Sequence, residues 1–386
     1  MNTVVTISGG GIIGNYISSR LNANNISTLV IEKNSDVLDF AENVRTVTLN
    51  QHSKNLIEKL GVNIPHSEIN EILVFDGEGS GKINFHSKDI DEENLSYVVF
   101  FNDLYRALQE KEKQRTIFGN TIEDIKENIE GQICEVLLTN KDKINSSFVA
   151  GCDGRNSNIA KLANLNINVS DYDQTAVTFT TRSDLQNNKK AFQVFSERGI
   201  FAAMPVPKNN SDSTHTIVWS IENNKLNNVK TVESYVKENI SYFEEKLNIE
   251  FEICSNLLTF KLTKHHFDSY ISDSMVLIGD AAHSIHPLAG QGINLGFADA
   301  DVFCDELIKG FEKSRKINRE LILKRYEVRR KQMNLLMLKS MDFFVEVFSS
   351  ENLFVKLARN IGLSGVNKMK FLKTFFINHA SGKNKL

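Results

Sequence analysis

Cysteine and tryptophan are scarce in this chain of 386 residues, which has four cysteines and one tryptophan. The cysteines are far apart and no C-x-x-C pair occurs, which argues against a disulfide framework, a zinc ribbon and a dithiol redox centre. Isolated, reduced thiols are typical of cytoplasmic proteins. The four are Cys134, Cys152, Cys254 and Cys304.

Long apolar runs are also missing, and no stretch of about 18 apolar residues is present to form a membrane-spanning helix. The segment Met1-Asn2-Thr3 lacks the basic residues that begin a signal peptide, and glycines interrupt the apolar stretch after it. We therefore expect a cytoplasmic protein. The net charge of −3 argues against nucleic acid as the main partner.

The chain does contain enough apolar material for a large core, because 41% of its residues are hydrophobic. Its length suits two intertwined domains. The 25 phenylalanines are compatible with an apolar substrate pocket, although a Phe-rich core explains them equally well.

A glycine-rich turn follows the first predicted strand, Val4–Ile7. Gly9, Gly11 and Gly14 form a G-x-G-x-x-G pattern, a helical pattern follows, and a second predicted strand ends on Glu32, 18 residues past Gly14. A βαβ unit of this kind places a pyrophosphate at the helix N-terminus and a ribose hydroxyl on the acid. Because Glu32 favours a free 2′-hydroxyl, we expect FAD or NAD rather than NADP.

A second glycine-rich stretch runs from Met275 to Ala300. A buried strand leads to Gly279-Asp280, then to a loop of small residues and a helix from about Ile293. Asp280 can accept a hydrogen bond from a sugar hydroxyl, while Gly290 and Gly292 allow backbone to approach a flat ring. The helix N-terminus offers N–H groups and a positive dipole to developing negative charge. An ordinary strand–turn–helix is the alternative.

His283 and His286, together with Asp280, could also be interpreted as ligands of non-haem iron. That interpretation leaves the glycines of the loop and the N-terminal fingerprint without a role. We therefore expect no metal site here. The expectation is instead that His283 lies in a turn beside the cofactor and that His286 faces the substrate.

With a Cys152-Asp153-Gly154 turn between them, these two stretches resemble the flavin-dependent aromatic hydroxylases of the para-hydroxybenzoate hydroxylase class. Within that class the chain is most similar to the ubiquinone-biosynthesis hydroxylases. The resemblance spans nearly the whole chain. Four stretches carry it: Asn43–Leu49, Tyr172–Val177, Gly279–Gly296 and Leu338–Gly382.

The resemblance implies an α/β (α+β) fold, in which a Rossmann-like FAD-binding domain is interleaved with a β-sheet substrate domain. The expected FAD-binding domain comprises residues 1–68, 97–165 and 267–310. The β-rich substrate domain comprises 69–96 and 166–266, and a helical C-terminal region comprises 311–386.

The resemblance also implies which residues bind FAD. The loop beside the reactive part of the flavin would contain Pro287, Gly290 and Gly292, and backbone N–H groups of Ile293 and Asn294 would face the flavin ring. No side chain is expected to act as a nucleophile, because the flavin carries the chemistry. The remaining expected FAD contacts are Gly9, Gly11, Ile13, Gly14, Glu32, Lys33, Arg45, Asp153, Gly279 and Asp280.

The substrate pocket is expected in the β-rich domain. Packing in an ordinary core explains each candidate at least as well. The candidates are Phe195, Phe201, Met204, Trp219 and His286.

The activity implied by the resemblance is FAD-dependent hydroxylation of the aromatic ring of a polyprenylated phenol or quinol in ubiquinone biosynthesis. NAD(P)H would reduce the flavin, and dioxygen would form a flavin hydroperoxide.

Two positions depart from the family's pattern: Phe101 stands where an Asn or Arg is frequent, and Ala160 where an Arg is frequent. A related hydroxylase of a soluble aromatic compound is one alternative. A flavoprotein scaffold without turnover, in a ubiquinone-biosynthesis complex, is the other.

The end of the chain is basic and aromatic, with no acidic residue beyond Glu351. A segment of this composition can lie on an anionic bilayer, so we expect peripheral contact with the inner membrane. The cations are Lys356, Arg359, Lys368, Lys370, Lys373, Lys383 and Lys385, and Phe371, Phe375 and Phe376 lie among them.

Overall fold

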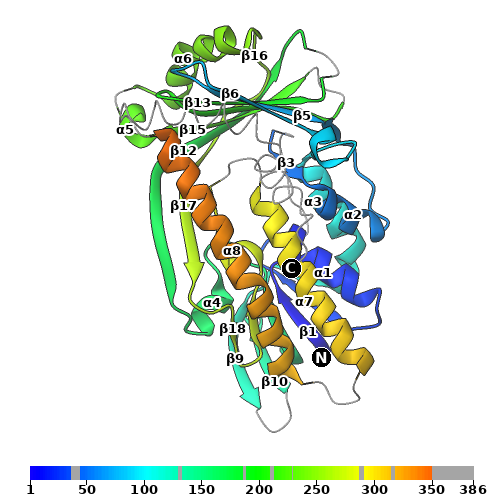
Figure 1. The fold of residues 1–386 in the computed structure, drawn as a ribbon. Coiled ribbons are helices and arrows are strands. Elements are labelled where there is room, and N and C mark those ends of the chain that lie inside the picture. The colour runs from blue at the N-terminus through cyan, green and yellow to red at the C-terminus, as the bar shows by residue number, and fades with distance from the viewer. Residues whose placement is uncertain are drawn as a thin grey trace.

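The structure is a computed structural model, and it describes residues 1–35, 44–128, 133–185, 188–208, 213–227, 229–286, 291–313 and 318–349. Two sheets organise these residues (Figure 1). A mainly parallel sheet lies in the lower half of the view with the long helices α7 and α8 in front of it. A nine-stranded, mainly antiparallel sheet lies across the top. The predicted mixed α/β fold class is confirmed.

The lower sheet has the strand order β18-β19-β11-β1-β2-β8, with the hairpin β9–β10 beside β11. Strands β19, β11, β1, β2 and β8 are parallel, so their carboxyl ends meet at one edge, where α/β proteins bind ligands. The strands are β1 (Asn2–Ser8), β2 (Thr28–Glu32), β8 (Thr116–Phe118), β9 (Ile122–Asn128), β10 (Ile133–Leu138), β11 (Lys143–Gly151), β18 (Ile271–Ser272) and β19 (Met275–Leu277).

Helices cover this sheet and bury one continuous core against it. The packing includes the edge-on pair of Tyr16 and Phe297, whose ring centroids are 5.3 Å apart, between α1 and α7. The helices are α1 (Ile12–Asn22), α2 (Gln51–Lys59), α3 (Phe101–Glu112), α4 (Asn158–Leu162), α7 (Gln291–Lys313) and α8 (Arg319–Ser349).

The upper sheet has the order β20-β17-β12-β15-β14-β13-β5-β6, with β16 beside β12. The long strands β12 and β17 run from the lower half of the molecule into this sheet (Figure 1). Its strands are β5 (Glu71–Asp76), β6 (Lys82–His86), β12 (Ile167–Arg182), β13 (Lys190–Ser196), β14 (Gly199–Pro205), β15 (His215–Glu222), β16 (Glu252–Ile253), β17 (Leu258–Phe267) and β20 (His283–Ser284).

Helix α6 (Val232–Leu247) covers the outer face of the upper sheet, and its apolar side packs on a cluster around Phe201 and Trp219. The opposite face looks toward α7 and α8. The short helix α5 (Asn223–Leu226) follows β15. A small third sheet joins the two halves through β3 (Thr46–Leu49), β7 (Ser96–Phe100) and β4 (Ser67–Ile69).

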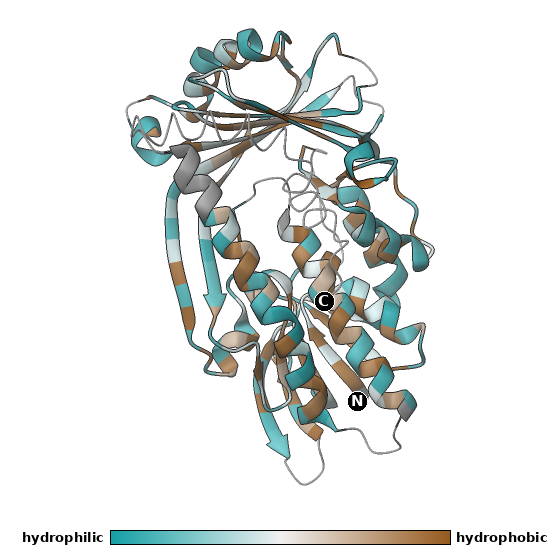
Figure 2. Cartoon of the chain, viewed as in Figure 1, coloured by the Kyte–Doolittle hydropathy of each residue, from teal (hydrophilic) through white to brown (hydrophobic). Residues whose placement is uncertain are grey.

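Helix α8 differs from α6 because it lacks a single apolar face. Hydrophobic and hydrophilic residues alternate along its described length (Figure 2). Leu323 and Tyr326 are buried in the lower core, whereas Met337 and Met341 contact clusters near the upper sheet. Thus α8 packs on both halves of the molecule. None of the helices, over their described residues, is long and apolar enough to cross a membrane.

Candidate functional site

The turn after β1 has the close packing that its glycines predict. Gly9 has a φ of +102°, and a Cβ there would lie 2.5 Å from the carbonyl oxygen of Cys152. A Cβ on Gly14 would lie 2.0 Å from the carbonyl oxygen of Gly9, so α1 can approach the turn only with glycine at that position. Gly11 differs from both, because its Cβ would meet no atom within 4 Å. The turn therefore leaves open space at the N-terminus of α1.

No side chain among the described residues caps the first N–H groups of α1. Uncapped N–H groups beside open space suit the pyrophosphate of a dinucleotide. Glu32, at the end of β2, is buried, and its Oε2 accepts a hydrogen bond of 2.7 Å from the Gly10 N–H. The same carboxylate accepts one of 2.9 Å from the Asn34 N–H. Glu32 therefore lies at the turn, where a ribose would be bound, and Lys33 beside it is exposed.

Asp153 mainly holds the turn together. Its Oδ2 accepts hydrogen bonds from the Ser8 hydroxyl at 3.2 Å and from the Asn158 N–H, at the start of α4, at 2.8 Å. Its Oδ1 is buried without a hydrogen-bond partner. Because Gly9 packs directly on this residue, Asp153 fixes the position of the first glycine.

Asp280 has the environment of a ligand-binding acid. It is exposed, although Gly279 and Ala281 on either side of it are buried. Among the described residues, none donates a hydrogen bond to its carboxylate, which is therefore available to a ribityl or ribose hydroxyl. Gly279 has a φ of +63°, and a Cβ there would lie 3.4 Å from the Gly296 Cα. The turn thus lies directly against α7, with Ile13 packed beside both glycines.

Arg45 lies close enough to this acid for the two charges to interact. Its guanidinium carbon lies 4.3 Å from the ring centroid of Phe101, at the start of α3. The side chain is exposed, yet surrounding protein atoms desolvate the guanidinium and lower the Arg45 pKa, while nearby Asp280 opposes this effect and Arg155 adds to it. Phe101 departs from the family's pattern, and its ring thus stabilises the Arg45 cation beside the expected cofactor through a cation–π contact.

The N-terminus of α7 completes the site. A Cβ on Gly292 would meet no atom within 4 Å, so the backbone there borders open space. The first four N–H groups of a helix have no acceptor within the helix. The buried Asn294 side chain accepts from the Asn50 N–H at 2.9 Å and donates to the Thr48 carbonyl at 2.8 Å, which anchors α7 to β3. Pro287 and Gly290 lie outside the described residues.

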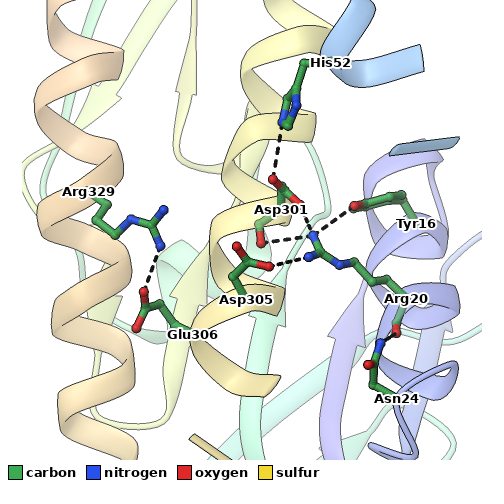
Figure 3. Close-up of polar contacts among 8 residues, drawn as sticks. All are labelled: Tyr16, Arg20, Asn24, His52, Asp301, Asp305, Glu306 and Arg329. Atoms are coloured by element: carbon green, nitrogen blue, oxygen red, sulfur yellow. Dashed lines mark hydrogen bonds and ion pairs between the residues drawn. The ribbon is translucent and has the colours of Figure 1, made fainter. Parts of the chain in front are cut away.

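An ion-pair cluster fixes α1 against α7 (Figure 3). The Arg20 guanidinium of α1 pairs with Asp301 and Asp305 of α7 and donates to the Tyr16 hydroxyl at 3.1 Å. His52 of α2 lies 3.3 Å from Asp301. The cluster holds in register the two helices whose N-termini border the open space.

Sequence reasoning missed the buried acid Asp299. Its carboxylate accepts hydrogen bonds from the Gly279 N–H at 3.1 Å, His283 Nε2 at 2.6 Å, Arg330 Nε at 2.7 Å and Asn334 Nδ2 at 3.0 Å. Desolvation alone would raise the pKa of Asp299, but His283, Arg330 and the hydrogen bonds hold that pKa below its usual range. One signal was available: an aspartate on the apolar face of a helix, four residues after Leu295.

Strand alternation divides the predicted pocket residues between two faces of the upper sheet. Phe201 and Trp219 point outward and are fully buried beneath α6, on the face away from α7. Packing in an ordinary core, the alternative given for every candidate, accounts for the placement of these two residues. Phe195 and Met204 lie on the inner face, where Phe195 packs near Met341 of α8 and Met204 Sδ lies 3.4 Å from the Thr48 hydroxyl.

His286 follows β20 and packs beside β12 of the upper sheet. It is buried, its Nε2 lies 2.9 Å from Gln174 Oε1, and its Nδ1 has no hydrogen-bond partner. Burial lowers the His286 pKa to about 4, and Asp342 opposes the shift, so the ring is neutral at pH 7. The Tyr172 ring packs edge-on against it at 4.9 Å, and the Tyr172 hydroxyl donates to Asp342 at 3.0 Å.

The metal interpretation has no support in this geometry. His283 is hydrogen-bonded to Asp299, and His286 to Gln174. In the described part of the chain, no group of three or more His, Cys, Asp or Glu side chains is placed to hold a metal ion.

The parallel sheet, the two glycine turns and the uncapped helix N-terminus together define a dinucleotide-binding protein. The sequence profile of the FAD binding domain family matches residues 2–339. The chain belongs to this family, and the predicted cofactor FAD is confirmed, as is the oxidoreductase class.

Relatives similar in sequence match along nearly the whole chain. A ubiquinone hydroxylase (UbiL) of Rhodospirillum rubrum is 26% identical over 399 residues, covering 99% of this chain and 90% of that protein. The 3-demethoxyubiquinol 3-hydroxylase of Escherichia coli is 25% identical and covers 98% of each chain. A ubiquinone biosynthesis monooxygenase (COQ6) of Caenorhabditis elegans is 25% identical and covers 97% of this chain and 95% of that protein.

Solved structures share the fold at lower identity. The p-nitrophenol 4-monooxygenase PnpA of Pseudomonas putida has a TM-score of 0.79 with 15% identity, and the match covers 100% of both chains. Klebsiella pneumoniae HpxO, solved with FAD and uric acid, has a TM-score of 0.76 with 13% identity, and 97% of each chain is covered. The fold is therefore that of FAD-dependent monooxygenases, and the predicted resemblance is confirmed.

Proposed function

We propose that this protein hydroxylates the aromatic ring of a polyprenylated phenol or quinol intermediate of ubiquinone biosynthesis. One observation carries the proposal: the chain aligns over at least 97% of its length with three proteins named for ubiquinone hydroxylation or biosynthesis. Bound FAD supplies the activation of dioxygen, and we propose NAD(P)H as its reductant.

The protein's contribution is to bind the cofactor and to exclude water. The pyrophosphate is bound at the turn of Gly9, Gly11 and Gly14, the adenosine ribose by Glu32, and the ribityl chain by Asp280. Arg45 supplies a positive charge beside the cofactor. The N-terminus of α7, at Gly292 and Ile293, faces the flavin ring, where its dipole favours negative charge on the ring.

The substrate lies between the inner face of the upper sheet and α7. Apolar side chains gather there: Phe195 and Met204 on the sheet, Ile285 near Leu295 of α7, and Met341 on α8. An apolar lining suits an isoprenoid substituent and keeps water from the reaction. The neutral His286, oriented by Gln174, supplies the polar contact for the ring hydroxyl.

A polyprenylated substrate is dissolved in a membrane, so the enzyme must reach a bilayer. We propose that the basic, aromatic segment after Glu351 makes peripheral contact with the inner membrane from the cytoplasmic side. This segment lies outside the described residues, and its composition alone supports the proposal. Assembly with other enzymes of the pathway is part of the same proposal.

The experiment is substrate-stimulated oxidation of NAD(P)H by the purified, FAD-loaded protein. Polyprenylated phenols should accelerate NAD(P)H loss and yield a hydroxylated ring detectable by mass spectrometry. Stimulation by water-soluble phenols alone would instead identify a hydroxylase of soluble aromatics. No stimulation by either class, with FAD bound, would refute the hydroxylase and support a scaffold. Truncation after Gly365 should reduce binding to anionic liposomes if the tail contacts the membrane.

A further inference from the structure

The buried carboxylate of Asp299 connects two parts of the molecule through its two oxygens. Oδ2 accepts from the Gly279 N–H and from His283, both in the segment that carries the Asp280 turn. Oδ1 accepts from Arg330 and Asn334, both on α8. A single side chain on α7 thus joins the turn to a helix that lies outside the residues expected to bind FAD.

The geometry leaves little freedom at this point. Gly279 has a left-handed backbone, and its N–H is oriented by Asp299, so the direction in which Asp280 projects depends on that hydrogen bond. Arg330 also donates to Asn334 Oδ1 at 3.0 Å, so the two α8 residues hold each other as well as the carboxylate. All four donors are needed because an unpaired charge at a fully buried site is costly.

We propose that Asp299 is a positioning residue for FAD: it holds the Gly279–Asp280 turn in its binding conformation and makes FAD affinity depend on Arg330 and Asn334 of α8. Helix α8 is then part of the cofactor site, although none of its described residues is expected to contact FAD. This inference rests on FAD binding alone and does not require the proposed substrate.

The chain contains a matched control. Glu306 of α7 pairs with Arg329 of α8 at 2.8 Å, which is also an acid of α7 bonded to an arginine of α8 (Figure 3). This second pair is partly exposed, and in the described part of the chain it makes no hydrogen bond or ion pair with the Gly279–Asp280 turn. Loss of either pair removes a link between the same two helices, but only the Asp299 pair is linked to the turn.

The test measures FAD dissociation constants of the apo-proteins by flavin fluorescence, with thermal unfolding of each apo-protein measured in parallel. Asp299→Asn replaces one carboxylate oxygen by an amide NH2 group. Both oxygens of Asp299 accept hydrogen bonds, so the NH2 group would face donors in place of one of them. It should raise the FAD dissociation constant roughly tenfold or more, within the range of typical coupling energies. Glu306→Gln should change that constant by less than about twofold.

Asn334→Ala is a milder variant that keeps the charge pair and serves if Asp299→Asn does not fold. It should weaken FAD binding by roughly threefold to tenfold, the loss expected for one hydrogen bond. In an Asp280→Ala background its effect should shrink, because Asn334 acts through the turn that aims Asp280.

The proposal is overturned if the folded Asp299→Asn variant binds FAD within about twofold of wild type while its apo-protein melts at a lower temperature. Asp299 would then be a packing residue only. If Asp299→Asn does not fold, an unchanged FAD constant for Asn334→Ala overturns the proposal equally. An effect of Asn334→Ala that is the same with and without Asp280 would also contradict it.

Discussion

Replacing Gly11 with alanine should separate two roles that glycines have in the turn after β1. Gly11 has φ −74° and ψ −172°, which alanine adopts without strain, and its Cβ would meet no protein atom within 4 Å. Reduced freedom of the unfolded chain should stabilise the variant by about 0.4–1 kcal/mol. A poorer residue at the helix N-cap should cost a similar amount. The stability of the apo-protein should therefore change by less than about 1 kcal/mol.

FAD binding should respond very differently to Gly11→Ala. The added methyl group occupies the space where a pyrophosphate approaches the backbone. A hydrogen bond between an N–H and a charged group contributes about 1.5–3 kcal/mol, so the loss of one such bond should weaken FAD binding about 10- to 150-fold. The assay is titration of the apo-protein with FAD by flavin fluorescence, alongside thermal unfolding.

Gly14→Ala is the contrasting variant. Its Cβ would lie 2.0 Å from the Gly9 carbonyl oxygen, so the turn and α1 must separate. Overpacking of this kind costs about 1–3 kcal/mol, and both stability and FAD affinity should fall. The reasoning is refuted if Gly11→Ala binds FAD like the wild type, or if it destabilises the apo-protein as much as Gly14→Ala does.

Three further predictions concern the upper sheet and the site. Phe201→Ala should destabilise the protein by about 3–5 kcal/mol in chemical denaturation and leave the order of preference among substrates unchanged, because the ring packs beneath α6. His286 has a pKa of about 4 when folded, below its ordinary value, so its neutral form stabilises the fold above pH 6.5 and that contribution is lost as pH falls from 6.5 to 4. His286→Gln should therefore flatten the dependence of unfolding free energy on pH in that window, and an unaltered slope would count against the buried neutral ring. Asp280→Ala should weaken FAD binding roughly tenfold with little change in apo-protein stability, since its carboxylate is exposed; a large drop in melting temperature would show that the acid is structural.

The cofactor turns were predictable because their signals are local. Gly14 is specified by close contact with the Gly9 carbonyl oxygen earlier in the same turn, and the strand before the turn shows its own pattern. Glu32 ends β2 and Asp280 lies in the turn after β19, which belongs to the same parallel sheet, so the topology brings the two carboxylates to one edge. Local residue spacing is sufficient for inferences of this kind.

The substrate side was harder because its geometry depends on tertiary packing. The period of two in β14 shows that Phe201 and Met204 face opposite ways, but only the docking of α6 decides which face is covered. The link between Asp299 and Arg330 joins residues on different helices with no motif between them. For Asn294, the sequence predicted that the backbone N–H faces the flavin ring. The structure shows a further role for the side chain, which hydrogen-bonds to two backbone groups around β3.

The order of these elements along the chain has a consequence for biosynthesis. Strand β1 has β11 as one of its neighbours, with Val5 opposite Phe148, and the turn after it needs α7, which begins at Gln291. A ribosome that has released only the first half of the chain has therefore exposed the complete glycine fingerprint without the groups that complete its binding site. Contacts so distant in sequence form slowly and leave strand edges exposed meanwhile. We therefore expect FAD capture only after α7 has been synthesised, and a shortage of FAD would act on chains that already include this helix.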